Sequence, residues 1–183
     1  MTATALPPRS DPATFRRALG HVPTSVCVVT TSDQNGPTGM TVGSFTSISL
    51  DPALVGFFAD SASTTLLRLR HAGHFTVNIL SDAQGAICQA FARKHGDRLA
   101  DVPLVSGEHP APRVAGAIGW IDCGLESVVT VGDHELVVGR VLDLDVPSVP
   151  SGPLVFFRGA LCQLDTRTVP SRGTWQRDHY AEW

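Results

Sequence analysis

The stretch Pro37-Thr-Gly-Met-Thr-Val-Gly-Ser-Phe-Thr-Ser-Ile-Ser-Leu-Asp-Pro52 is the most informative part of this sequence. It combines strand-forming residues with glycines and small hydroxyl residues. Small side chains let a flat ring approach the backbone, and hydroxyl and free N–H groups can form hydrogen bonds with its heteroatoms. An ordinary Ser/Thr-rich strand with alternating faces is the simpler interpretation, and composition alone favours it. The stretch therefore predicts strand structure first and a ring-binding surface second.

The segments on either side of this stretch predict many strands and few helices. Asp11 and Pro12 are typical of a helix start, and this helix is expected to end at Gly20. Asp33-Gln-Asn-Gly36 predicts a hairpin turn. Ser81-Asp82-Ala83-Gln84 fits a capping box, in which Ser81 caps the next helix and Gln84 reaches back. The expected strands cover residues 24–31, 38–50, 54–59, 74–80, 117–131, 135–146 and 154–164, with a helix over 61–70 and an irregular surface loop over 96–113.

About six long strands with two or three short helices favour a closed β barrel over a doubly wound sheet. The 183 residues fit one domain, expected over residues 11–165, with an N-terminal arm over 1–10 and a C-terminal tail over 166–183. Hydrophobic residues make up 43% and charged residues 17%, which excludes a disordered chain. The net charge of −3 argues against a nucleic-acid partner.

Several kinds of chemistry have no signal in the sequence. Cys27, Cys88, Cys123 and Cys162 form no CxxC pair, so we expect buried, reduced thiols and no metal site. The N-terminus lacks the apolar core of a secretory signal, and no apolar run is long enough to span a membrane, which favours a cytoplasmic protein. There is no GxGxxG after a strand, no Walker A loop, no HExxH and no GxSxG.

Other polar groups have both a structural and a functional interpretation. The hydroxyls of Ser61-Ala-Ser-Thr-Thr65 open a helix and could bind a phosphate, although simple N-capping needs only one of them. Gly132-Asp133-His134 is typical of a turn, and a histidine that moves a proton or contacts a redox partner is the alternative. Asp143 and Asp145 share a strand face, where solvated side chains are more common than a catalytic pair. His71 and His74 are expected to be ordinary surface or loop residues.

Taken together, these pieces resemble the flavin reductase-like family, the reductase components of two-component flavin-dependent monooxygenases. The resemblance runs from about Phe15 to Leu164. The stretches that carry it are Gly39-Met-Thr-Val-Gly-Ser-Phe-Thr-Ser-Ile-Ser-Leu-Asp-Pro52, Phe75-Thr-Val-Asn-Ile-Leu-Ser81, Gly132-Asp-His134 and Pro153-Leu-Val-Phe-Phe-Arg-Gly159. The resemblance implies a mainly β, six-stranded split barrel of Greek-key type that forms a homodimer. It also implies an oxidoreductase that uses NADH or NADPH to reduce FMN or FAD, and a partner monooxygenase that receives the reduced flavin.

The resemblance also assigns site residues. His134 is expected beside the nicotinamide as the candidate catalytic residue, in an orienting role rather than for obligatory acid–base chemistry. The loop of Val149, Pro150, Ser151 and Gly152 is expected to contact the nicotinamide dinucleotide. The expected flavin contacts are Thr38, Gly39, Met40, Thr41, Gly43, Ser44, Phe58, Ala59, Asp60, Ser63, Thr64, Thr65, Ala90 and Phe91. Ser63, Thr64 and Thr65 are assigned to the flavin phosphate. The family often has a larger polar residue where this chain has Gly43, so one flavin hydrogen bond is in doubt and the pocket is expected to be wider.

Two alternatives stay open from the sequence. A split-barrel flavoprotein could hold FMN tightly and reduce another substrate, or the chain could be a flavin-binding module without turnover. The motifs do not distinguish FMN from FAD or NADH from NADPH.

Overall fold

The structure is a computed structural model that describes residues 11–93, 98–147, 151–165 and 167. The expected N-terminal arm, most of the expected tail, Val149 and Pro150 lie outside these residues. Within the described ranges the fold is mainly β with three short helices, as predicted. The described helices do not include one long and apolar enough to cross a membrane.

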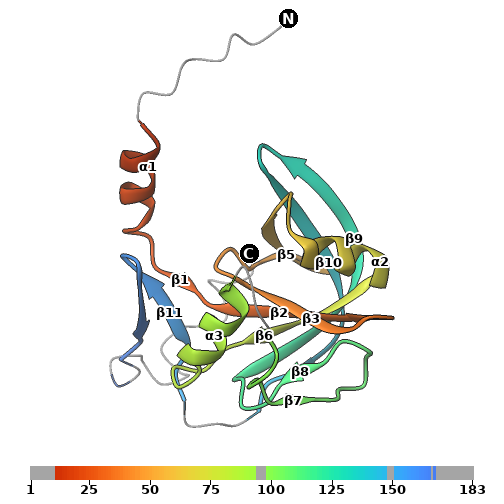
Figure 1. Cartoon of the computed structure of the whole chain (residues 1–183). Coiled ribbons are helices and arrows are strands. Elements are labelled where there is room, and N and C mark those ends of the chain that lie inside the picture. Colours follow the sequence, from red (N-terminus) through yellow and green to blue (C-terminus); the bar gives the residue numbers. More distant parts are fainter. Residues whose placement is uncertain (1–10, 94–97, 148–150, 166, 168–183) are drawn as a thin grey trace, which may run out of the picture.

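The first helix, α1 (Pro12–Leu19), begins and ends as predicted. The Asp11 carboxylate accepts hydrogen bonds from the backbone N–H groups of Ala13 and Thr14 at 2.9 and 3.0 Å, which satisfies two of the free donors at the helix start. The helix ends at Gly20. None of its residues is buried, and Figure 1 shows it projecting from the body of the molecule.

Strands predicted as continuous are each broken in two. Residues 24–31 form β1 (Thr24–Ser25) and β2 (Cys27–Asp33), which belong to different sheets. Residues 38–50 form β3 (Gly36–Val42) and β4 (Thr46–Leu50). Residues 154–164 form β11 (Leu154–Phe157) and β12 (Ala160–Gln163), because the positive φ angles of 50° at Arg158 and 82° at Gly159 turn the chain back. The hairpin turn at Asp33–Gly36 is confirmed, with Gly36 at φ 87°.

The main sheet has seven strands in the order β3-β2-β6-β9-β10-β5-β4, and all of its pairs are antiparallel. Its other members are β5 (Ala53–Asp60), β6 (His74–Ile79), β9 (Gly119–Val131) and β10 (His134–Asp145). The two edge strands, β3 and β4, are joined by only three residues, Gly43 to Phe45. The chain therefore passes directly from one edge strand of the sheet to the other, and the sheet has seven strands instead of the expected six because the predicted strand over 38–50 is broken here.

The remaining elements cover the sheet. α2 (Thr64–Ala72) and α3 (Gly85–Ala92) pack against it, β1 joins β11 and β12 in a three-stranded sheet, and β7 (Leu104–Val105) pairs with β8 (Arg113–Val114). The expected irregular loop over 96–113 is thus partly wrong, since it contains β7 and leads to the fully buried Val114. The Gln84 side chain accepts from the Ser81 N–H at 3.0 Å, as the capping box predicts, but the N-cap of α3 is Gln84 and not the predicted Ser81, because the helix begins at Gly85.

The sheet buries side chains on both faces. On one face Phe57 and Phe75 meet edge to face, with ring centroids 5.6 Å apart, and Leu66 and Leu69 of α2 cover them. On the other face Cys88 and Phe91 of α3 pack with residues that include Val28, Leu80, Val114 and Leu154. Apolar burial on two faces is the main source of stability in such a fold.

A buried group of polar side chains, here called the polar cluster, lies next to this second face. Its members are Thr30, Thr76, Asn78, Arg113 and Asp122. Thr76 donates to Asp122 at 2.5 Å, and Arg113 Nη2 lies 2.6 Å from the other carboxylate oxygen. The Asn78 side chain accepts from the Val114 N–H at 2.6 Å and donates to Thr30 at 3.0 Å. The polar cluster therefore fastens the 111–114 segment to β2 and β6.

Candidate functional site

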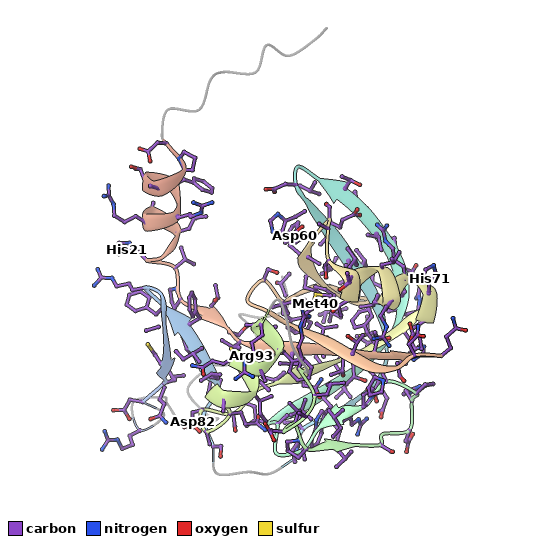
Figure 2. The ribbon with its side chains drawn as sticks, viewed as in Figure 1. His21, Met40, Asp60, His71, Asp82 and Arg93 are labelled. Atoms are coloured by element: carbon purple, nitrogen blue, oxygen red, sulfur yellow. The ribbon has the colours of Figure 1, made fainter. Side chains whose placement is uncertain are left out.

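A cleft of about 800 Å³ opens between α1 and the main sheet. Its walls come from α1, β3, the end of β5, the start of α2, the end of α3 and the start of β10. Figure 2 shows Met40 between Asp60, at the end of β5, and Arg93, just after α3. The predicted site residues that line this cleft are Met40, Thr41, Gly43, Ser44, Phe58, Ala59, Asp60, Ser63, Phe91 and His134.

The corner between β3 and β4 is tied to β5 by one hydroxyl. Ser44 Oγ accepts a hydrogen bond from the Phe58 N–H at 2.9 Å and lies 3.3 Å from the Phe58 carbonyl. On β3 itself, the Thr41 hydroxyl donates to the Cys88 carbonyl at 2.8 Å. The Ser44 and Thr41 hydroxyls both have backbone hydrogen-bond partners. They therefore hold neighbouring segments of the cleft wall together, and both residues also line the cleft.

The start of α2 separates the three hydroxyl residues that were predicted to act together. Ser63 is the N-cap, and its Oγ accepts from the Leu66 N–H at 3.2 Å. Thr65 is buried and donates to the Gly39 carbonyl at 3.3 Å, whereas Thr64 is exposed. Ser63 is therefore the member of this group that lines the cleft, and its capping role is the structural interpretation given above.

His134 lies at the first position of β10, opposite Asp60 on β5 and Val131 on β9. Its Nδ1 lies 2.7 Å from a carboxylate oxygen of Asp133, which can only accept, so Nδ1 carries the proton. This hydrogen bond holds the pKa of Asp133 below its usual value. The side chain of His134 is 49% exposed and faces the cleft, which leaves it accessible to a ligand.

Some predicted site residues lie away from the cleft lining. Thr38, Gly39, Thr64, Thr65 and Ala90 lie within two residues of lining residues in the sequence but do not line the cleft themselves. Ser151 and Gly152 lie elsewhere, because the Gly152 carbonyl accepts from the Asp82 N–H at 2.9 Å, just before α3. The structure does not bring these two residues to the cleft beside His134.

Sequence reasoning missed three cleft residues of one type, Arg16, Arg93 and Arg98. Arg98 Nη1 lies 3.4 Å from both the Gly39 carbonyl and the Thr65 hydroxyl, close to the start of α2. It follows α3 within the segment expected to be an irregular surface loop, so strand and helix patterns gave no reason to single it out. Its positive charge in a segment between structured elements was the available signal.

The described residues offer little support for metal or thiol chemistry. Among them, no group of three or more His, Cys, Asp or Glu side chains could hold a metal ion. The four cysteines are unpaired thiols. Burial raises the pKa values of Cys27 and Cys123 to about 12, so both remain protonated at neutral pH.

The fold and cleft define a class of protein. A mainly β domain with a large open cleft, lined by apolar groups, small hydroxyl residues and arginines, is suited to a flat heteroaromatic ligand with an anionic group. A family model described as the flavin reductase like domain matches residues 19–165. The chain belongs to this family.

Individual relatives agree with the family match. The chain is 45% identical over 150 residues to a flavin reductase of Pseudomonas putida, covering 81% of this chain and 88% of that one. Among solved structures, nitrilotriacetate monooxygenase component B of Mycobacterium thermoresistibile gives a TM-score of 0.85 at 32% identity, covering 92% of this chain and 94% of that one. An NADH:FAD oxidoreductase of Streptomyces globisporus, in complex with NAD and FAD fragments, gives a TM-score of 0.80 at 31% identity. The match covers 88% of this chain and 97% of that one.

Proposed function

We propose that this protein is an NAD(P)H:flavin oxidoreductase that reduces free FMN or FAD and supplies the reduced flavin to a partner monooxygenase. The observation that carries the proposal is the convergence of ten predicted flavin or nicotinamide contacts on one cleft. Relatives named as a flavin reductase and as a monooxygenase component support the two halves of this activity. The chemistry, hydride transfer from nicotinamide C4 to flavin N5, is supplied by the two ligands themselves.

The residues present fit a flavin in size and chemistry. The cleft volume of about 800 Å³ lies within the range of ligand pockets. Phe58, 41% exposed, and Met40, which also lines the cleft, provide apolar surface for a flat ring. Thr41, Gly43 and Ser44 follow along the same wall with small side chains, so the ring can approach the backbone. These residues would bind and orient the ring and exclude water from one of its faces.

The flavin phosphate is assigned to the start of α2 with the help of an arginine. Ser63 lines the cleft at the N-terminus of a nine-residue helix, where backbone N–H groups favour an anion. Arg98 lines the cleft near the same place, with its Nη1 3.4 Å from the Thr65 hydroxyl. A phosphate there would be held by charge and by hydrogen bonds at once.

His134 is assigned to the nicotinamide. Because Nδ1 donates to Asp133, Nε2 is left as a hydrogen-bond acceptor in the neutral ring. An acceptor at this position can hold the amide group of a nicotinamide and so set the angle of its ring. The role is to orient the donor, as expected from the sequence.

The test of the activity is stopped-flow NADH and NADPH oxidation with FMN and FAD compared side by side. A colourless protein that oxidises the donor when free flavin is added supports the proposal. A yellow protein that keeps its flavin on gel filtration and reduces no added flavin supports a flavoprotein with another substrate. A protein that oxidises neither donor with either flavin is a binding module, and the proposal then fails.

The test of His134 compares His134→Ala with His134→Gln and with His71→Ala, an exposed histidine outside the cleft. We expect His134→Ala to raise the KM for NADH about tenfold, the value of one hydrogen bond. His134→Gln should recover part of this loss, and His71→Ala should change nothing. Unchanged KM and hydride-transfer rate in His134→Ala would contradict the role.

The proposal includes a homodimer in the cytoplasm, where reduced thiols such as those of this chain persist. One face of β5, β10 and β9 is apolar, since Phe58, Leu136 and Val129 lie opposite one another in register. The exposed apolar side chains of β4, β5, β9 and β10 include Ile48, Leu50, Phe58, Val129, Leu142 and Leu144. Exposed apolar side chains on neighbouring strands of one sheet support an interface there. Light scattering should give a dimer, and Leu142→Glu with Leu144→Glu should give a monomer; a monomeric wild type would contradict this part.

A further inference from the structure

Two arginines of the cleft differ from the arginines that support the fold. Among the described residues, the arginines that form an ion pair with a carboxylate are Arg68, Arg70, Arg113, Arg140 and Arg167. Arg16 and Arg93 have no such partner in the described part of the chain, and both line the cleft. Their charges are therefore available to a ligand.

Arg16 and Arg93 come from different elements on the cleft wall. Arg16 lies on α1, which projects from the body of the molecule (Figure 1), and Arg93 is the C-cap of α3. Both residues are exposed, whereas Arg98 is half-buried beside Thr65. The charges of Arg16 and Arg93 therefore act through solvent on a ligand that is not yet bound.

The cleft is positive on a chain that is negative as a whole. Three arginines line it, and among the described lining residues Asp60 is the one carboxylate. The whole chain, in contrast, has a net charge of −3. A separate cavity of about 760 Å³ beside the Asp33–Gly36 turn contains both Asp33 and Arg68, which neutralise each other. A positive cleft on a negative protein directs anions to the cleft.

We infer that Arg16 and Arg93 draw phosphorylated flavins into the cleft by long-range attraction, so that the protein takes up FMN or FAD faster than riboflavin. The inference rests on the proposed function and names the part of the flavin that governs its uptake. Riboflavin has the same ring as FMN but lacks the negative phosphate. Fixed charges at a cleft raise the association rate constant of an oppositely charged ligand, and salt weakens this attraction. The two arginines thus act before the phosphate reaches Ser63.

The test measures the association and dissociation rate constants of FMN and of riboflavin by stopped-flow flavin fluorescence. Arg16→Gln, Arg93→Gln and the double variant are compared with Arg140→Gln, which removes the same charge elsewhere. Arg140 is exposed, pairs with Glu126 and lies about 20 Å along β10 from His134. Potassium chloride is varied from about 10 to about 150 mM, which shortens the screening length from about 30 to about 8 Å.

We expect the association rate constant of FMN with the wild type to fall about tenfold over this range of salt, and that of riboflavin to stay nearly constant. At low salt, each single variant should take up FMN about threefold more slowly than the wild type, and the double variant about tenfold. Arg140→Gln should match the wild type. Dissociation rate constants should change less than association rate constants.

Two results would overturn the inference. One is an association rate constant for FMN that is as insensitive to salt as that for riboflavin. The other is a pair of variants in which only the dissociation rate constant rises, because the arginines would then hold bound flavin instead of attracting free flavin. Neither result bears on flavin reduction, which is assayed separately with NADH and NADPH. A wild type that takes up FMN as expected but reduces it with neither donor refutes the proposed function instead.

Discussion

The polar cluster and the cleft use the same kinds of side chain in opposite ways. In the polar cluster, Thr76, Asn78 and Asp122 are fully buried, and each has a partner within the chain. In the cleft, Ser44, Ser63 and His134 make local bonds but face a space of about 800 Å³. Residue type alone therefore does not separate a structural polar group from a functional one; the space in front of it does.

Two arginines, Arg113 in the polar cluster and Arg98 in the cleft, show the same difference between a structural and a ligand-facing position. Arg113 is 11% exposed and Asp122 only 1%, and their hydrogen bond raises the pKa of the guanidinium. Arg98, in contrast, lines the open cleft, with its Nη1 3.4 Å from the Gly39 carbonyl and from the Thr65 hydroxyl. An arginine paired with a buried carboxylate serves the fold, whereas an arginine that lines a cleft can also meet an anionic ligand.

The largest expected effect comes from breaking the polar cluster. Asp122→Ala leaves the Arg113 charge without its buried partner and should lower the free energy of unfolding by about 3–5 kcal/mol in urea denaturation. The KM for flavin of the protein that remains folded should not change. Asp145→Ala is the control, because Asp145 is 54% exposed and 3.7 Å from Arg113, and it should cost less than about 1 kcal/mol. Equal losses of unfolding free energy in Asp122→Ala and Asp145→Ala would contradict the structural role of the buried pair.

A smaller effect is expected where the two regions meet, at Gly39. A Cβ atom here would lie 2.6 Å from Phe91 Cε1 and 2.9 Å from the Val29 carbonyl. Gly39→Ala should therefore cost about 1–3 kcal/mol through overpacking, and it should raise the KM for flavin because the displaced Phe91 lines the cleft.

Gly43→Ala provides the matched comparison, since its closest contact would be Thr24 Oγ1 at 3.1 Å and the nearest backbone atom, the Ser25 carbonyl oxygen, would lie at 3.9 Å. Urea denaturation should give a smaller loss of stability for this variant. If Gly39→Ala is as stable as the wild type and binds flavin equally well, the close packing of β3 against α3 does not shape the cleft.

The smallest effect is expected at a more exposed ion pair. Arg68 donates to Asp33 at 2.6 and 2.9 Å and lowers the pKa of that carboxyl to about 2, from about 3.9 when unfolded. The pair therefore stabilises the fold above about pH 4, and this contribution disappears as the pH falls towards 2. Thermal unfolding of wild type and Arg68→Met should differ slightly at pH 7 and converge at low pH. A difference that grows on acidification would contradict the assignment.

The sequence predicted what depends on local pattern. The α1 cap, the Asn-Gly turn and the alternating strands are set by neighbouring residues, and the structure has them where expected. The breaks at Val26 and at Gly43 to Phe45 were missed, since a strand that changes sheet keeps its strand-like composition. The extra strand of the main sheet follows from the missed break at Gly43 to Phe45.

The site was predicted in part, for a related reason. Its β3, β5 and β10 residues came from motifs that the family resemblance could match, and they line one cleft. Arg16, Arg93 and Arg98 were missed because their position depends on how segments pack and not on any local pattern. Ser151 and Gly152 were assigned to the nicotinamide dinucleotide because of their position in the sequence. In the structure, the Gly152 carbonyl accepts a hydrogen bond from the Asp82 N–H, which holds this loop beside the start of α3.

Arg98 and Arg113 lie on the same segment of the chain, between α3 and β9. Arg98 lines the cleft and Arg113 pairs with the buried Asp122, so the length of the segment between them sets the positions of both side chains. A residue inserted or deleted between them should therefore displace one of the two arginines and weaken either ligand binding or stability. Exchanging this segment between related enzymes should succeed only when it includes both arginines.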